Sequence, residues 1–161
     1  MDDATQFDEG LFQHDPGGEY LHLMREVLLT FRLFARELSD EMGASGSQLA
    51  LLRQMALAGG RSTVSSLARE LAVDPAAVTR LVAGLTKLGL LAREQDGRDG
   101  RRRPVVLTPA GRDLVVDMHA RLHEREAALE GKLDKASLET TMRVLQTIRD
   151  VLEHGAAGRR S

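Results

Sequence analysis

The chain has 161 residues, of which 42% are hydrophobic, with no cysteine and a formal net charge of −2. This length fits one domain, or a small domain with an assembly element. The lack of cysteine excludes disulfides and thiolate metal sites, and no apolar run approaches the roughly 18 residues of a membrane-spanning helix. The acidic start lacks the basic and apolar segments of a signal sequence, so we expect a soluble intracellular protein.

The charges are unevenly distributed along the chain. Residues 1–46 hold 3 basic and 10 acidic side chains, whereas residues 47–112 hold 11 basic and 5 acidic ones. A basic middle between acidic ends favours a polyanion-binding segment set within a self-association scaffold. The alternative is a merely solvated charged surface, which composition alone does not exclude.

The N-terminal part is predicted to be an acidic arm followed by a long helix. Residues 1–18 are acidic and polar, which is typical of a disordered arm. From Tyr20 to Met42, apolar residues recur at spacings of three and four, which predicts a helix that Gly43 ends. Because apolar residues lie on two faces of this helix, we expect the segment 19–46 to pack against two partners and to serve in dimerisation.

Two short helices are predicted next. Ser47 is expected to cap a helix over residues 48–58, and Thr63 a helix over residues 64–72. Each serine or threonine would supply a side-chain oxygen for the N–H groups that have no partner at the start of a helix.

Asp74 and Pro75 mark the start of a further helix, predicted over residues 75–88. The aspartate can accept hydrogen bonds as the cap, while proline at the first helical position loses no bond. Val78, Val82 and their apolar neighbours are expected to face inward.

A two-stranded hairpin is predicted after this helix. Its strands are residues 90–94 and 104–108, and the stretch between them gathers four arginines. Thr108 and Pro109 repeat the cap-plus-proline signal and open another long helix, to about residue 131.

The C-terminal part is predicted to be helical and to serve in dimerisation. Asp134 is expected to cap a last helix with apolar residues at helical spacing, and residues 113–154 form the C-terminal dimerisation helices. Residues 155–161 are expected to be a disordered tail.

Two short helices joined by a tight turn, followed by a basic-tipped hairpin, predict a winged helix-turn-helix. The expected fold is therefore mainly α with a small β-hairpin wing, plus long dimerisation helices. A helix fits the major groove of DNA, and an arginine-tipped ribbon can reach the adjacent minor groove. The residues predicted to bind DNA are Thr63, Ser65, Ala76, Ala77, Thr79, Arg80, Lys87, Arg98, Arg101, Arg102 and Arg103.

Arg80 and the wing arginines also have simpler interpretations. An exposed arginine can merely solvate its helix face, and Asp96 and Asp99 offer local partners for the wing arginines. The neighbouring Asp74–Pro75 helix start and the basic hairpin favour the DNA role for Arg80.

The segments SSLARELAVDPAAVTRLVAGLTKLGLLARE and DGRDGRRRPVVLTPAGR resemble the winged-helix core of the multiple antibiotic resistance regulator (MarR) family of bacterial transcription factors. The resemblance is dense over residues 47–112, the expected DNA-binding domain. It implies that Arg101 enters the minor groove and that Asp99 orients it. It also implies a homodimer in the bacterial cytoplasm that binds pseudo-palindromic double-stranded DNA. In many members of the family, a small phenolic or carboxylate effector releases the protein from the DNA.

The chain departs from the family pattern in three places. Ala83 and Gly84 replace a frequent Asp-Arg pair, so a second groove-facing arginine is absent. Gly84 also lowers the stability of the helix by about 1 kcal/mol relative to alanine at this position. Gly100 replaces the first of the paired wing arginines. The cysteine of the redox-sensing branch is missing.

A ligand site is expected at polar groups on the long helices. The candidates are His22, Arg25, His119 and His123, which an acidic effector could pair with if they are buried. Alternatively, they reach solvent or pair with Glu26 and Glu124. The two histidines one turn apart could also bind a metal, but no complete ligand set is visible, so no metal and no cofactor is predicted.

No enzyme is predicted, because no glycine-rich phosphate loop, nucleophile elbow or paired-carboxylate arrangement occurs. The predicted function is a ligand-responsive repressor of the MarR type. The alternative is a non-catalytic winged-helix module for protein interaction, with no membrane involved in either case.

Overall fold

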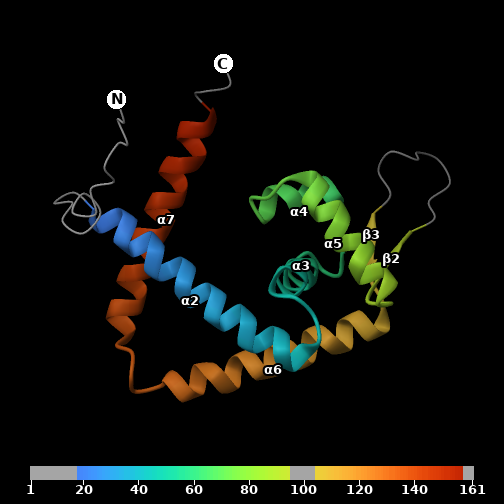
Figure 1. Ribbon diagram of the computed structural model, residues 1–161, viewed down its shortest axis with the longest axis horizontal. Helices are drawn as coiled ribbons and strands as arrows, with labels where there is room; N and C mark the ends of the chain where they lie inside the picture. The colour runs from blue at the N-terminus through green and yellow to red at the C-terminus, as the bar shows by residue number, and fades with distance from the viewer. Residues whose placement is uncertain (1–17, 95–103, 158–161) are drawn as a thin grey trace, which may run out of the picture. The chain divides into compact units, whose positions relative to one another are not determined.

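The computed structural model describes residues 18–94 and 104–157, which form six helices and a small antiparallel sheet (Figure 1). The helices are α2 (Glu19–Met42), α3 (Gly46–Leu57), α4 (Val64–Glu70), α5 (Pro75–Lys87), α6 (Pro109–Leu129) and α7 (Lys135–Ala157). The strands are β1 (Arg61–Ser62), β2 (Leu91–Arg93) and β3 (Val105–Leu107). The chain divides into two compact units, residues 1–118 and 119–161.

The predicted mainly α fold with a hairpin is confirmed, and most predicted helix starts and stops coincide with the observed ones. Thr63 and Asp74 cap α4 and α5 by accepting hydrogen bonds from the N–H groups of Ser66 and Ala76. Helix α2 ends at Gly43, whose φ of 65° lies in the left-handed region that glycine adopts without strain.

The predicted cap of α3 was wrong by two residues. Ser45, not Ser47, accepts from the N–H of Gln48, and the Gln48 side chain in turn accepts from the N–H of Ser45. This reciprocal pair satisfies two N–H groups at once, whereas Ser47 already lies within the helix. The last helix also extends further than predicted, because α7 continues to Ala157 and includes residues 155–157 of the expected tail.

The sheet has one strand more than the predicted hairpin. Strand β3 lies in the middle and pairs with both β1 and β2, all antiparallel. The extra strand is the two-residue β1, whose Arg61 is opposite Val106. It adds an outer strand to the wing directly before α4, so the wing and the helix-turn-helix share one sheet.

The core of the first unit joins the short helices to the sheet. Its fully buried side chains come from α3, α4, α5, β2 and β3, and they are mostly leucine and valine. The buried cluster consists of Leu51, Leu52, Met55, Leu67, Ala68, Val78, Val82, Leu85, Leu91, Val105 and Leu107. Burial of such side chains stabilises each by about 1.5–3 kcal/mol relative to exposure, so this cluster sets the position of α5.

The start of α6 packs directly against the residue before β2. A Cβ atom on Gly111 would lie 2.1 Å from the carbonyl oxygen of Leu90, which no real side chain tolerates. The hydroxyl of Thr108 caps this helix by accepting from the N–H of Gly111, and it donates to the carbonyl of Gly89. Three adjacent features therefore fix where α6 leaves the sheet.

The long helices α2 and α7 leave much apolar surface uncovered in the single chain. Exposed side chains on α2 include Leu21, Phe31 and Leu33, and on α7 they include Met142 and Val151. Over residues 135–155, whose side chains the structure describes, no residue of α7 is buried. Among the described residues, no helix is both long and apolar enough to span a membrane.

Candidate nucleic-acid interface

Helix α5 has one buried face and one exposed face. Val78, Val82 and Leu85 are fully buried in the core. The exposed positions on the rest of the helix include Ala76, Thr79, Arg80, Ala83 and Lys87. Within α5 itself the charged residues are Arg80 and Lys87, both basic. The exposed face therefore carries small, polar and positively charged side chains.

The predicted DNA-binding side chains of α5 are available for contacts. Among the described residues, no hydrogen bond or ion pair engages the side chain of Arg80 or Lys87. Because these two residues are seven positions apart, which is about two turns, they lie on the same face of the helix. The Thr79 hydroxyl donates to the carbonyl of Pro75 at 2.9 Å and keeps its lone pairs for an incoming donor. Ala76 is exposed and Ala77 half-buried, so no bulky side chain blocks the start of the helix.

The two predicted residues near the start of α4 differ in what they can offer. Ser65 is exposed. Thr63 is half-buried and uses its hydroxyl oxygen to cap α4 through the N–H of Ser66. Its hydroxyl proton is still able to donate, so the cap and a phosphate contact are compatible.

Helix α4 is tied to α3 by a carboxylate that the sequence analysis did not single out. Glu70 accepts from the side-chain amide of Gln54 at 2.8 Å and from the hydroxyl of Ser66 at 2.9 Å. These hydrogen bonds, that from Gln54 first, hold the pKa of Glu70 below its ordinary value. The carboxylate therefore stays ionised at neutral pH and fixes the first helix of the motif on its support.

A second unpredicted pair lies at the base of the hairpin. Arg61 of β1 donates to both carboxylate oxygens of Glu94, at distances from 2.8 to 3.2 Å. The hydrogen bonds from Arg61 lower the pKa of Glu94. Sequence reasoning missed this pair because 33 positions separate its members and β1 was not predicted.

The arginines predicted at the wing tip, together with Asp99, lie outside the described residues. These are Arg98, Arg101, Arg102 and Arg103. The structure describes the two strands up to Glu94 and from Pro104, where the Glu94 N–H donates to the Pro104 carbonyl at 3.1 Å. The roles of the tip residues remain predictions.

The four predicted ligand residues are all exposed in the single chain. Arg25 forms an ion pair with the adjacent Glu26 at 2.5 Å, which agrees with the alternative that these residues pair with nearby glutamates. The rings of His119 and His123 lie 4.4 Å apart, and His123 approaches Glu126 rather than Glu124, at 3.3 Å. Within the described ranges, no three His, Cys, Asp or Glu residues come together in a way that could hold a metal ion.

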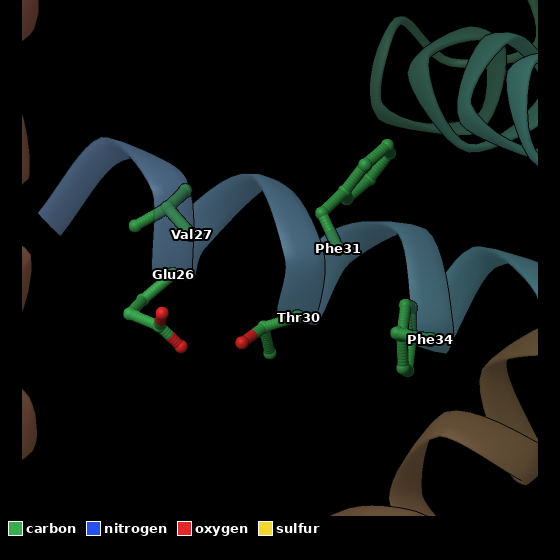
Figure 2. A pocket seen from close by; sticks show the side chains of 5 residues that line it. All are labelled: Glu26, Val27, Thr30, Phe31 and Phe34. Carbon is green, nitrogen blue, oxygen red and sulfur yellow. The ribbon is translucent and has the colours of Figure 1, made fainter. Parts of the chain in front are cut away.

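One surface hollow of about 410 Å³ lies on α2, next to the predicted ligand residue Arg25. Its walls are Glu26, Val27, Thr30, Phe31 and Phe34, all from this single helix (Figure 2). Glu26, Thr30 and Phe34 follow one another at intervals of one turn and point to the same side of the helix, whereas Phe31 points to another side (Figure 2). The expectation from sequence did not include these aromatic residues in the site.

Three comparisons with known proteins agree with this architecture. Residues 42–102 match the model of the MarR family. A proposed transcriptional regulatory protein for the hcr operon of Thauera aromatica is 26% identical over 127 residues, which are 79% of this chain and 76% of that protein.

Solved structures share the fold over most of the chain. The DNA complex of Staphylococcus aureus MepR is 23% identical with a TM-score of 0.71, covering 83% of this chain and 97% of that one. The organohalide-sensing regulator RdhR, bound to 2,4-dichlorophenol, is 21% identical with a TM-score of 0.69, covering 96% of this chain and 93% of that one. The capped helix-turn-helix lies within residues 42–102, the segment that matches the family model, so over this part of its length the chain resembles the MarR family of transcriptional regulators.

Proposed function

We propose that this protein is a ligand-responsive repressor that binds a pseudo-palindromic operator as a homodimer, with α5 in the major groove. The observation that carries the proposal is the exposed face of α5. It presents Thr79, Arg80 and Lys87 on a helix whose opposite face is fully buried. A helix held in this way can place donors against base edges without losing its fold.

The electrostatics of this face support DNA over a protein partner. Arg80 and Lys87 have no acidic neighbour within α5, whereas phosphate is the commonest partner of such groups in protein–DNA complexes. The MepR structure, which shares this fold, is a DNA complex. A module that binds protein instead would not require an exposed face of small and basic residues.

The effector is proposed to be a small phenolic molecule. The hollow on α2 offers the ring of Phe34 one turn from the hydroxyl of Thr30, which suits an aromatic ring bearing a hydroxyl group. Glu26 would repel a carboxylate but can accept from a phenol. The structural neighbour RdhR binds 2,4-dichlorophenol, which is of this class.

DNA binding is tested by selecting duplexes from a random-sequence library with the full chain. We expect enrichment of an inverted repeat, with an affinity that falls steeply as salt rises, because phosphate contacts release counterions. The absence of any enriched duplex, or an affinity insensitive to salt, would contradict the proposal and favour the protein-interaction module.

The role of Arg80 is tested with Arg80→Ala on the selected duplex. We expect a loss of about 1–3 kcal/mol in binding free energy and a relaxed preference at one base pair of each half-site, as for a lost bidentate base contact. Arg53→Ala is the matched control, since Arg53 is an exposed arginine on α3, outside the proposed interface. Circular dichroism checks that both variants fold. If the two variants bind alike, the assignment of Arg80 is wrong.

A further inference from the structure

An ion pair crosses the sheet at the base of the wing. Val106 of β3 is opposite both Arg61 of β1 and Ala92 of β2. Directly opposed residues point to the same face of a sheet, as do residues two apart on one strand, so Arg61 and Glu94 share a face. The Arg61 side chain therefore reaches over the middle strand and joins the two outer ones.

The contact is a fork with fixed geometry. Arg61 donates through Nε to both oxygens of Glu94, at 3.0 and 3.2 Å, and through Nη2 to one of them at 2.8 Å. The Glu94 backbone N–H also donates to the carbonyl of Pro104. Glu94 is thus held by both its backbone and its side chain at the last described rung of the hairpin.

The position of Arg61 links this rung to the helix-turn-helix. Strand β1 ends at Ser62, and Thr63 then caps α4. A side chain that fixes the end of β2 relative to β1 consequently fixes it relative to the start of α4.

The pair is poorly placed to contribute much to folding. The side chains of Arg61 and Glu94 are 57% and 39% exposed, and exposed ion pairs add little to the free energy of unfolding. Leu91, Val105 and Leu107 already hold the strands in the core. What the pair can control is the direction in which the hairpin leaves the sheet.

We propose that the Arg61–Glu94 pair is a clamp that sets this direction, so that both are positioning residues for DNA binding by the wing. The inference rests on the proposed DNA-binding function. In the competing interpretation, Arg61 contacts a phosphate directly and Glu94 merely competes with the DNA for it. The two interpretations predict opposite signs when Glu94 loses its charge.

The test is Glu94→Gln, measured on the duplex selected by the parent chain and on a scrambled duplex of equal length. If Glu94 is part of the clamp, tight binding to the selected duplex requires its charge. The variant should then bind this duplex at least about fivefold more weakly, which is the smallest effect expected from the loss of one groove contact. Affinity for the scrambled duplex should rise or stay the same, because a negative charge has gone. Asp113→Asn controls for the charge change, since Asp113 is exposed on α6.

The exchanged pair Arg61→Glu with Glu94→Arg completes the experiment. The double variant should bind the selected duplex better than Arg61→Glu alone, because the ion pair forms again in the opposite direction. The thermal midpoint should stay within a few degrees in all variants. If Glu94→Gln binds the selected duplex as tightly as the parent or tighter, the clamp is overturned. If the parent selects no duplex at all, it is the DNA-binding function that fails.

Discussion

Two glycines show how differently the same residue type acts in this protein. Gly111 lies where α6 touches the backbone of Leu90, and a Cβ atom has no room there. Gly84, inside α5, would meet only the side-chain amide nitrogen of Gln48, at 3.2 Å. The sequence predicted the cost of Gly84 from helix propensity, but it could not reveal the contact at Gly111, which depends on how α6 crosses the sheet.

Substituting each glycine by alanine should therefore change stability in opposite directions. Gly111→Ala should destabilise the protein by about 1–3 kcal/mol or more, because the added methyl group forces backbone atoms apart. Gly84→Ala should stabilise it by up to about 1 kcal/mol, because alanine favours the helix and the flexible end of Gln48 can shift. Urea unfolding measures both. A shift of the two variants in the same direction would show that these contacts are misjudged.

The arginine candidates were predictable to different degrees. The exposure of Arg80 follows from helical periodicity alone, since Val78, Val82 and Leu85 take the inner face. The Arg61–Glu94 pair depends on strand pairing between distant segments, which no local pattern encodes. The wing arginines between Glu94 and Pro104 remain predictions from sequence.

Helix boundaries were predictable where the cap is a short local motif. The Asp74–Pro75 start is read correctly because both residues act within one turn. Ser47 alone does not identify the start of α3, whereas Ser45 and Gln48 form the pattern Ser-x-x-Gln. A capping box uses both ends of that pattern, so the glutamine distinguishes Ser45 from Ser47 as the cap.

The last helix should depend on pH through its cap. The N–H of Ser137, and then its hydroxyl, hydrogen-bond to the carboxylate of Asp134 at 2.9 Å and hold the pKa of Asp134 below its ordinary 3.8. A depressed folded-state pKa stabilises the fold above the unfolded pKa, and this contribution is lost as the pH falls through the folded value. Asp134→Ala should therefore be less stable than the parent at pH 7, and the difference should shrink below pH 3.8.

Measurement is by urea unfolding of parent and Asp134→Ala at a series of pH values, with Lys135→Ala as the control next to the cap. The control should keep a constant difference from the parent across the acid range. A difference for Asp134→Ala that does not change with pH would mean that the carboxylate charge is not what caps α7.

At the scale of the whole molecule, the uncovered apolar side chains of α2 and α7 call for a second copy. The winged-helix unit has its own core, whereas none of the described side chains of α7 is buried in the single chain. Sequence periodicity predicted apolar faces on these helices, but it could not say which chain covers them, because that depends on packing between molecules. The homodimer is therefore a proposal about assembly rather than about local structure.

We expect a dimer in sedimentation at micromolar concentration. Leu138 and Met142 lie one turn apart on α7 and are 46% and 57% exposed in the single chain. Replacing both by lysine should shift the equilibrium to monomer, because two charges would be buried without partners. Asp150→Lys, on the charged side of the helix, should leave the dimer intact. A parent chain that sediments as a monomer would remove the basis for a palindromic operator.

Control by an effector would couple the ligand site to the DNA-binding surface. A ligand shifts the protein only as far as its affinities for the DNA-competent and DNA-incompetent forms differ. Since linkage is reciprocal, saturating operator DNA must weaken effector binding by the factor by which the effector weakens DNA binding. Titration calorimetry with 2,4-dichlorophenol as the probe should thus show a lower affinity in the presence of the selected duplex.

The location of the effector is tested by the hollow on α2. Phe34→Ala removes one aromatic wall and should weaken binding of the phenol while leaving DNA binding in its absence unchanged. Arg36→Ala is the neighbouring control, an exposed residue of α2 that does not line the hollow. Equal phenol affinity with and without DNA would mean that the phenol is not the control signal, even if it binds. Equal affinity for Phe34→Ala and the parent would place the effector elsewhere, because an aromatic ligand that loses a ring from its pocket loses both buried area and stacking.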